Sequence, residues 1–460
     1  MSSIANLSSQ LEKLVGSDRV NTSEALLQTF AIAGRAPMAV LKPRTLEEVA
    51  EIVSFAAAEK LAVIACGGRT KLELGMPPQR YDLALDMIGL CQIAHYDAGD
   101  LTVSVDAGMP LMNLATALAA RKQFLPLAVP FSSTSTIGGA ISSGVDSTLR
   151  MQYGTSRDFL IGAEFVDGTG RRCKSGGRVV KNVTGYDLHK LLIGSLGTLG
   201  VITRLNFRTY PLPELRGACT ASFPGMEAAL NFHDYLLKSG LPFSNLELFD
   251  PQFSGLLAGY SNQAGGSIPA SLKENAWHVF ASFEGIAGVM ARVQRELQER
   301  CERAQAAHYE TLDPQDSKRW SGALQESFDW LRSAAANVAL LRIALPQWAP
   351  KDVAELHLVL KQSPLRSAFA LRACNVAYLA LLAEGEDAQT NAAMERCVSH
   401  VRSCVEAKDG SAALLYSPAR LKDRINVWGT KRADFPLMQR VKRAFDPHNI
   451  FAPGRFVGDL

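Results

Sequence analysis

The chain has 460 residues, of which 47% are hydrophobic and 20% are charged, and its formal net charge is +3. This balance is typical of a globular protein with two or three domains and gives no reason to expect a nucleic-acid partner. The N-terminus lacks the basic and apolar regions of a signal peptide. We therefore expect a cytoplasmic protein, with any contact to the inner face of the membrane made through partners. The eight cysteines form no C-x-x-C pair, so no metal site is expected.

Strand and helix patterns alternate from residue 39 onward. Thr45 and Glu48 predict a capping box at the start of a helix whose apolar face holds Val49, Ile52, Val53 and Ala56. A buried strand is predicted over 61–65, and a further strand over 101–105 precedes a helix over 110–121. A long polar loop is then predicted over 130–158, followed by a hairpin that turns at Asp167 and Gly168.

The pattern changes after Pro213. Strands alternate with predicted helices over 226–238, 352–361 and 391–407. Repeated β-α-β units of this kind predict two ferredoxin-like halves on an antiparallel sheet. We predict an α+β fold in three parts: a domain over 1–212, a cap over 213–420 and a C-terminal segment over 421–460 that returns to the first domain.

The stretch GYDLHKLLIGSLGTLGVIT, residues 185–203, places Gly194, Gly197 and Gly200 in an apolar run. The run is too short to cross a membrane, which takes about 20 residues. Glycines at this spacing also disfavour a regular helix, because each costs about 1 kcal/mol relative to alanine. The stretch therefore predicts a buried turn whose backbone approaches another group closely.

Three loops rich in Gly, Ser and Thr occur in the first 200 residues, over 67–71, 132–139 and 194–200. We call them the first, second and third loops. Loops without Cβ atoms can direct several N–H groups at one anion. The G-x-G-x-x-G and G-x-x-x-x-G-K-[ST] motifs are absent, which argues against a Rossmann site or a P-loop. Taken together, the three loops predict a site for the pyrophosphate of a dinucleotide.

These motifs carry a family resemblance. VVKNVTGYDLHKLLIGSLGTLGVIT closely resembles the signature of flavoproteins in the vanillyl-alcohol oxidase/PCMH superfamily. STIGGAISSG with YGTSRD, CGGRTKLELG and the tail LMQRVKRAFDPHNIFAPGR are similar to its other flavin loops and its closing motif. Within the superfamily, the chain is most similar to the E-subunit family of bacterial glycolate oxidases. The resemblance implies a PCMH-type FAD-binding domain of two subdomains with a ferredoxin-like cap.

The resemblance also implies a cofactor site. Covalent members attach FAD to a histidine in the first loop, and no histidine stands there, so we expect non-covalent FAD. The residues that the resemblance assigns to the cofactor are Gly67, Gly68, Arg69, Thr70, Lys71, Ser133, Thr136, Gly138, Gly139, Gly154, Asp158, Gly185, Tyr186, Gly194, Gly197, Thr198, Gly200, Val201 and Ile202.

The implied activity is oxidation of a small 2-hydroxy acid, with hydride passing from substrate C2 to the flavin and electrons then passing through an iron–sulfur subunit to a quinone. The implied partners are a second FAD subunit and that iron–sulfur subunit. Leu196 stands where the catalytic D subunits show an acid, and Ala452 replaces the usual Asn of the closing motif. The metal and base motif of self-sufficient relatives is not visible. Two alternatives stay open: a self-sufficient FAD-dependent D-2-hydroxy acid dehydrogenase, and a non-catalytic flavin-bearing scaffold subunit.

Three single residues are candidates for catalysis. Arg342 lies among apolar neighbours in a predicted strand, so it binds either a substrate carboxylate or an internal acid. His189 stands near the flavin signature and would relay a proton, or it is a residue of a short helix without a chemical role. Trp428 would close the flavin cleft or pack the returning tail onto the first domain.

Overall fold

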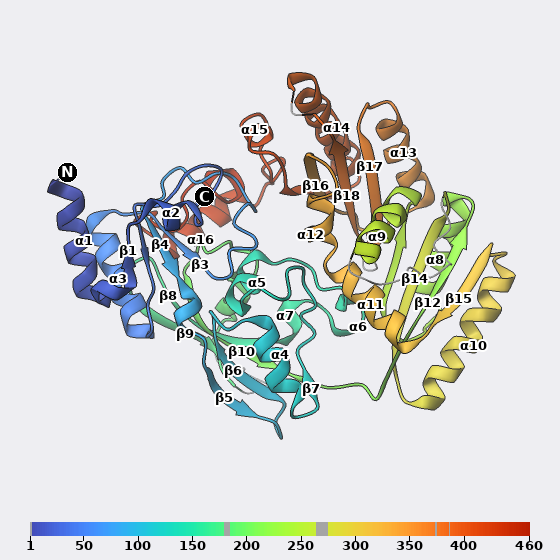
Figure 1. Cartoon of the computed structure of the whole chain (residues 1–460), viewed down its shortest axis with the longest axis horizontal. Coiled ribbons are helices and arrows are strands. Elements are labelled where there is room, and N and C mark those ends of the chain that lie inside the picture. Colours follow the sequence, from blue (N-terminus) through green and yellow to red (C-terminus); the bar gives the residue numbers. More distant parts are fainter. Residues whose placement is uncertain (1, 179–184, 264–274, 373–374, 386) are drawn as a thin grey trace.

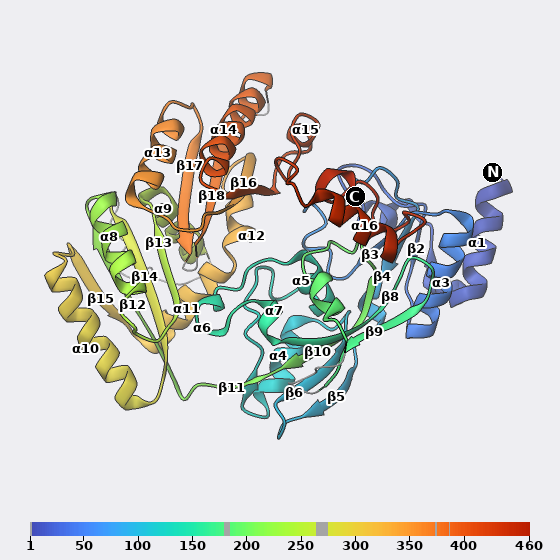
Figure 2. The same cartoon turned by 180° about the vertical axis from the view of Figure 1, so that it is seen from behind.

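The structure is a computed structural model that describes residues 2–178, 185–263, 275–372, 375–385 and 387–460. The start of the glycine-rich signature, residues 179–184, lies outside the described residues. Figures 1 and 2 show two bodies, the N-terminal domain with the C-terminal segment on one side and the cap on the other. Within the described ranges, no helix is long and apolar enough to cross a membrane.

The first subdomain is built on a sheet with the strand order β1-β2-β4-β3, in which β2, β4 and β3 are parallel. Its helices α1 and α3 share one apolar core with the sheet. Its elements are α1 (Ser2–Val15), η1 (Ser17–Arg19), β1 (Val20–Asn21), α2 (Glu24–Gln28), β2 (Ala39–Leu41), α3 (Leu46–Glu59), β3 (Val63–Cys66), β4 (Leu83–Asp86) and η2 (Met87–Gly89).

Helix α3 buries the four predicted apolar residues. Thr45 Oγ1 accepts a hydrogen bond from Glu48 N at 3.1 Å, as a helix cap does. A full capping box would also have the Glu48 carboxylate accept from Thr45 N. Among the described hydrogen bonds it accepts instead from the preceding residue, with Arg44 N 2.7 Å from Glu48 Oε2.

The second subdomain is an antiparallel sheet with the order β5-β6-β10-β8-β9. Strands β8 and β9 form the predicted hairpin. Its elements are β5 (Ile93–Asp97), β6 (Thr102–Asp106), α4 (Leu111–Ala119), β7 (Gln123–Phe124), α5 (Ile137–Ser143), α6 (Arg150–Tyr153), α7 (Ser156–Phe159), β8 (Leu160–Val166), β9 (Arg172–Gly176), η3 (Leu188–Leu191), β10 (Val201–Arg208) and β11 (Tyr210–Pro211).

The prediction of one long polar loop over 130–158 is wrong, because α5, α6 and α7 lie in it. Gly138 and Gly139 disfavour a helix by propensity, yet both lie in α5. A Cβ at Gly138 would lie 2.8 Å from Ala107 Cβ and 2.9 Å from Ala107 O. Gly138 is therefore required by the close packing of α5 on the end of β6, and this packing overrides propensity.

The cap is one eight-stranded antiparallel sheet with the order β15-β12-β14-β13-β17-β18-β16-β19. Each half has the strand order of a ferredoxin-like unit, and β13 joins the halves by pairing with β17, which confirms the prediction. Its elements are β12 (Leu215–Phe223), α8 (Met226–Leu237), β13 (Phe243–Phe249), α9 (Pro251–Gln263), β14 (Trp277–Gly285), α10 (Ala287–Arg303), β15 (His308–Leu312), α11 (Pro314–Gln325), α12 (Ser327–Arg332), β16 (Asn337–Ala344), α13 (Pro350–Lys361), β17 (Arg366–Arg372), β18 (Val376–Ala383), α14 (Ala388–Glu406) and β19 (Ser411–Tyr416).

Two apolar cores lie on opposite faces of this sheet. Helices α8, α10, α13 and α14 cover one face. Helices α9, α11 and α12, which were not predicted, cover the other face, and this second core also takes in Leu74 and Val145 from the N-terminal domain. Figure 1 shows α11 and α12 on the side of the cap nearest that domain.

The chain then returns to the first subdomain through α15 (Ala419–Lys422), α16 (Phe435–Phe445) and η4 (Val457–Asp459). Val63 N donates to Ile450 O at 2.7 Å, and Ala452 N donates to Val63 O at 3.0 Å. The tail thus continues the edge of the first sheet beside the first loop. The boundaries at 212 and 420 remain predictions.

Candidate functional site

The first and second loops are in direct backbone contact. A Cβ at Gly68 would lie 1.7 Å from Thr134 O, and one at Gly67 would lie 2.0 Å from Thr136 Oγ1. Lys71 Nζ donates to Ser135 Oγ at 2.6 Å. Only glycine permits so close an approach at positions 67 and 68.

The third loop reaches the other end of α5. Gly194 N donates to Ile141 O at 2.9 Å, and Leu196 N donates to Ser142 O at 2.8 Å. A Cβ at Gly144 would lie 2.7 Å from Gly194 Cα, so these two backbones are also in contact. The three predicted loops therefore meet around one short helix.

An open hollow lies where the loops meet, and Leu196 of the third loop lines it together with residues of the first and second loops. In the described part of the chain, the backbone N–H groups of Gly68, Arg69 and Thr70 have no hydrogen-bond acceptor. Burial lowers the pKa of Lys71 to about 8, with Glu326 opposing the shift. Three uncommitted N–H groups beside an amine fit the pyrophosphate of a dinucleotide. Thr136 and Gly139 also line the hollow, whereas Ser133 is exposed on the second loop.

The third loop is the predicted buried turn. Gly194 and Gly197 both have a φ of +73°, which glycine adopts without strain. A Cβ at Gly200 would lie 2.9 Å from Val166 O, so this glycine permits the approach of β8. Strand β10 begins at Val201, and Val201 and Ile202 are buried in two neighbouring cores.

The Thr198 side chain is held within the turn. Its hydroxyl donates to Ser195 O at 2.7 Å, and the residue is 1% exposed. The hydroxyl therefore stabilises the turn, and its role toward the cofactor stays a prediction.

Gly154 and Asp158 form a helix cap at α7. Asp158 Oδ2 accepts from Thr155 N at 2.7 Å, and a Cβ at Gly154 would lie 2.4 Å from the same carboxylate oxygen. The helix cap alone therefore accounts for a glycine at 154 and an aspartate at 158, and no ligand is needed to explain these residue types.

Gly185, Tyr186 and His189 lie beside the hairpin of β8 and β9. Gly185 has a φ of +87°, and Tyr186 is 90% exposed. His189 is buried, with Nδ1 3.0 Å from Ser175 Oγ on β9. Burial, and then the charge of Lys190, lower the pKa of His189, which keeps the ring neutral. These contacts describe a packed histidine.

Buried cations of the C-terminal segment fix the loops, and the sequence analysis did not single them out. Lys442 Nζ donates to Thr198 O at 2.9 Å and to Asp446 Oδ2 at 2.7 Å. Lys422 Nζ donates to Gly75 O at 3.0 Å, and Arg455 donates to two carbonyl groups that follow the first loop. The i, i+4 spacing of Lys442 and Asp446 in the closing motif was the available signal.

Arg342 lies in a charged cluster between the two domains. Its Nε donates to Asp146 Oδ2 at 2.6 Å, and Tyr378 Oη donates to the same oxygen at 3.2 Å. Burial disfavours the charged form of Asp146, but Arg342 and Arg150 outweigh this effect, so the pKa of the carboxyl lies below its usual value. The interdomain cluster consists of Asp146, Arg150, Glu247, Arg342, Arg372 and Tyr378.

Trp428 packs the returning tail. Its Nε1 donates to Arg455 O at 3.0 Å, and its ring lies 5.1 Å from that of Phe456. These contacts support packing of the returning tail as the role of Trp428, rather than closure of the flavin cleft.

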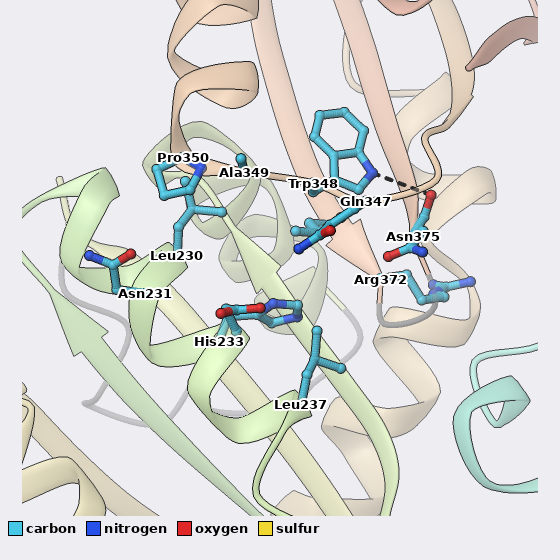
Figure 3. Close-up of a pocket in the computed structure, with 12 residues that line it drawn as sticks. Leu230, Asn231, His233, Leu237, Gln347, Trp348, Ala349, Pro350, Arg372 and Asn375 are labelled. Atoms are coloured by element: carbon cyan, nitrogen blue, oxygen red, sulfur yellow. Dashed lines mark hydrogen bonds between the residues drawn. The ribbon is translucent and has the colours of Figure 1, made fainter. Parts of the chain in front are cut away.

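A separate hollow lies in the cap between α8 and the start of α13, as Figure 3 shows. Trp348 Nε1 donates to Asn375 O at 3.2 Å on one side of it, and His233 lines it from α8. Burial lowers the pKa of His233 to about 4, so this ring is neutral. None of the predicted site residues lines this hollow.

Comparison with known proteins agrees with this geometry. Residues 37–176 match the family model described as FAD binding domain, and residues 212–345 and 427–456 match that of FAD linked oxidases, C-terminal domain. The chain is 24% identical to glycolate oxidase subunit GlcD of Bacillus subtilis over 91% of this chain and 88% of that protein. It is 29% identical to glycolate oxidase subunit GlcE of Escherichia coli over 64% of this chain and 82% of that protein.

The structure is also similar to that of p-cresol methylhydroxylase with substrate bound, with a TM-score of 0.78 and 18% identity over 99% of this chain and 97% of that one. This likeness shows the fold. The predicted α+β architecture with a PCMH-type FAD-binding domain is confirmed, and the FAD-binding match supports FAD as the cofactor.

Proposed function

Because this chain belongs to the FAD-linked oxidase family, we propose that it is the FAD-binding, E-type subunit of a glycolate or related 2-hydroxy acid oxidase complex. The observation that carries the proposal is the meeting of three glycine-rich loops around α5, in a domain whose Asp146 pairs with Arg342 of the cap. The names of two relatives, both subunits of glycolate oxidase, support the substrate class.

In this proposal, different groups of residues bind the cofactor, exclude water and attract the substrate. The first and second loops and Lys71 hold the pyrophosphate, and Leu74, Phe131, Val145 and Leu196 form an apolar wall against the cap that excludes water. Bound FAD supplies the acceptor for the hydride that leaves substrate C2. The interdomain cluster contains three guanidinium groups and two carboxylates, so one positive charge is left to attract a substrate carboxylate at Arg342.

A partner subunit would complete the active site. Among the described residues of the interdomain cluster, the only carboxylate that touches both domains is Asp146, and its two arginines keep it ionised and weakly basic. His189 is packed against β9, and Leu196 provides no acid. We propose that a second FAD subunit and an iron–sulfur subunit assemble with the chain in the cytoplasm, at the inner face of the membrane.

The test is to purify the tagged chain alone and with its native partners, and to measure dye reduction with glycolate and D-lactate. We expect both preparations to contain FAD and only the complex to turn over either acid. Equal turnover by the isolated chain would establish the self-sufficient dehydrogenase instead. If a flavin-free variant of the chain supports the same activity of the complex as the flavin-bearing chain, the chain is a non-catalytic scaffold subunit.

A further inference from the structure

A carboxylate of the cap reaches into the second loop. Glu326 lies between α11 and α12, and its Oε2 accepts from Phe131 N at 2.6 Å. Its Oε1 accepts from Ser132 N at 3.1 Å and from Ser132 Oγ at 2.6 Å. One side chain of the cap therefore receives three hydrogen bonds from two consecutive residues of the N-terminal domain.

The turn that Glu326 holds leads directly to the predicted cofactor loops. Phe131 has a φ of +61°, and its carbonyl accepts from Ser135 N at 2.8 Å, which closes the turn. Ser135 Oγ then accepts from Lys71 of the first loop. Lys71 Nζ lies 5.2 Å from the centroid of the Phe131 ring, and the Arg332 guanidinium of α12 lies 4.6 Å from it. The position of the cap is thus linked through one turn to both loops.

We propose that Glu326 is a positioning residue for the cofactor, which fixes the turn over 131–135 from the cap and so sets how tightly the first and second loops hold FAD. The inference rests on the FAD site and not on the identity of the substrate. A backbone turn held by a carboxylate loses less conformational freedom when the cofactor binds, and this raises affinity. Glu326 also places a negative charge near Lys71, which favours the charged amine.

Glu284 offers a matched control. It is also a cap carboxylate that contacts the N-terminal domain, since its Oε2 accepts from Tyr153 Oη at 2.6 Å. Its Oε1 accepts from Arg216 Nε at 3.0 Å, within the cap. Tyr153 belongs to α6 and lines neither the hollow nor the three loops. Removing Glu284 therefore weakens the contact between the domains without releasing the turn.

The experiment measures the Kd of FAD for the full-length, flavin-depleted chain by quenching of flavin fluorescence, with a melting curve for each variant. We expect Glu326→Ala to raise the Kd by about 10- to 100-fold, because all three hydrogen bonds to the turn are lost and FAD binding must then fix the backbone of one or two more residues. Glu326→Gln, which keeps one acceptor oxygen, should show a smaller increase. Glu284→Ala should lower the melting temperature and leave the Kd within about twofold of that of the unmodified chain.

An unchanged Kd in Glu326→Ala would overturn the proposal. An equal increase in Glu284→Ala would also overturn it, because the general contact between the domains would then control affinity. Ser132→Ala removes only one of the three hydrogen bonds, so it keeps the proposal testable if Glu326→Ala does not fold. For Ser132→Ala we expect the Kd of FAD to rise by about threefold to tenfold. A Kd equal to that of the unmodified chain in this variant and in Glu326→Gln would count against the proposal. Because only FAD is titrated, a failure here is distinct from a failure of the proposed glycolate chemistry.

Discussion

Gly200→Val is expected to abolish flavin retention and to destabilise the N-terminal domain. The new Cβ would lie 2.9 Å from Val166 O and 3.1 Å from the Phe165 ring, so β10 and β8 would have to separate. Overpacking of this kind costs about 1–3 kcal/mol. The same shift would displace the third loop from α5, and we expect no flavin to remain bound after gel filtration, with the cap still folded. Flavin absorbance per chain and a melting curve measure both effects.

Gly197 provides an informative comparison with Gly200. Within the described residues, a Cβ at Gly197 would meet no atom within 4 Å, so the space beside it is free in the chain. Gly197→Asn keeps a residue that tolerates the left-handed conformation. We expect this variant to fold with nearly normal stability and to lose flavin, because the side chain enters space that we assign to the cofactor. Full FAD occupancy in Gly197→Asn and Gly200→Val, with unchanged melting temperatures, would contradict this account of the third loop.

Arg342→Leu is expected to lower the free energy of unfolding by about 3 kcal/mol, the lower end of the range for breaking a buried ion pair, because Asp146 keeps Arg150. Asp146 has an 8% exposed side chain, so it cannot recover its solvation from water. In the assembled complex, the same variant should raise the KM for glycolate at least about tenfold, since the excess positive charge at the interface is lost. Chemical denaturation of the isolated chain and dye-reduction kinetics of the complex measure the two effects.

Arg366→Leu is the matched control for Arg342→Leu. Arg366 lies in β17 and pairs with Glu384, but both side chains are exposed, so its loss should cost less than about 1 kcal/mol. If Arg342→Leu destabilises the chain while the folded fraction keeps a normal KM, Arg342 has a structural role only. If Arg342→Leu lowers the free energy of unfolding by no more than Arg366→Leu does, the internal ion pair with Asp146 contributes nothing to stability.

The sequence was sufficient to predict the features that depend on local pattern. The apolar face of α3 follows the helical period, and the two ferredoxin-like halves of the cap follow the repeated β-α-β order. The three loops were predicted from their glycines, and the reason for Gly67 and Gly68 is a backbone contact that a side chain would prevent. These features leave a signal in residue type or in spacing.

Contacts between distant segments could not be predicted in the same way. Asp146 and Arg342 are 196 positions apart, and Glu326 reaches Ser132 across 194 positions. Nothing in the local pattern around either residue identifies its partner. Helix α5 was missed because its two glycines oppose helix formation locally, whereas the packing against Ala107 that requires Gly138 is tertiary. Ala452, where the related motif has Asn, adopts a φ of +42°, a left-handed conformation that Asn tolerates better than Ala.

The most direct test of the central claim, that three loops around α5 hold one FAD non-covalently, is an absorbance spectrum of the purified chain before and after acid precipitation. We predict one FAD per chain in the native spectrum and a colourless pellet, with all of the flavin in the supernatant. Flavin that stays in the pellet would contradict non-covalent binding, and a purified, folded chain that takes up no FAD would contradict the site itself.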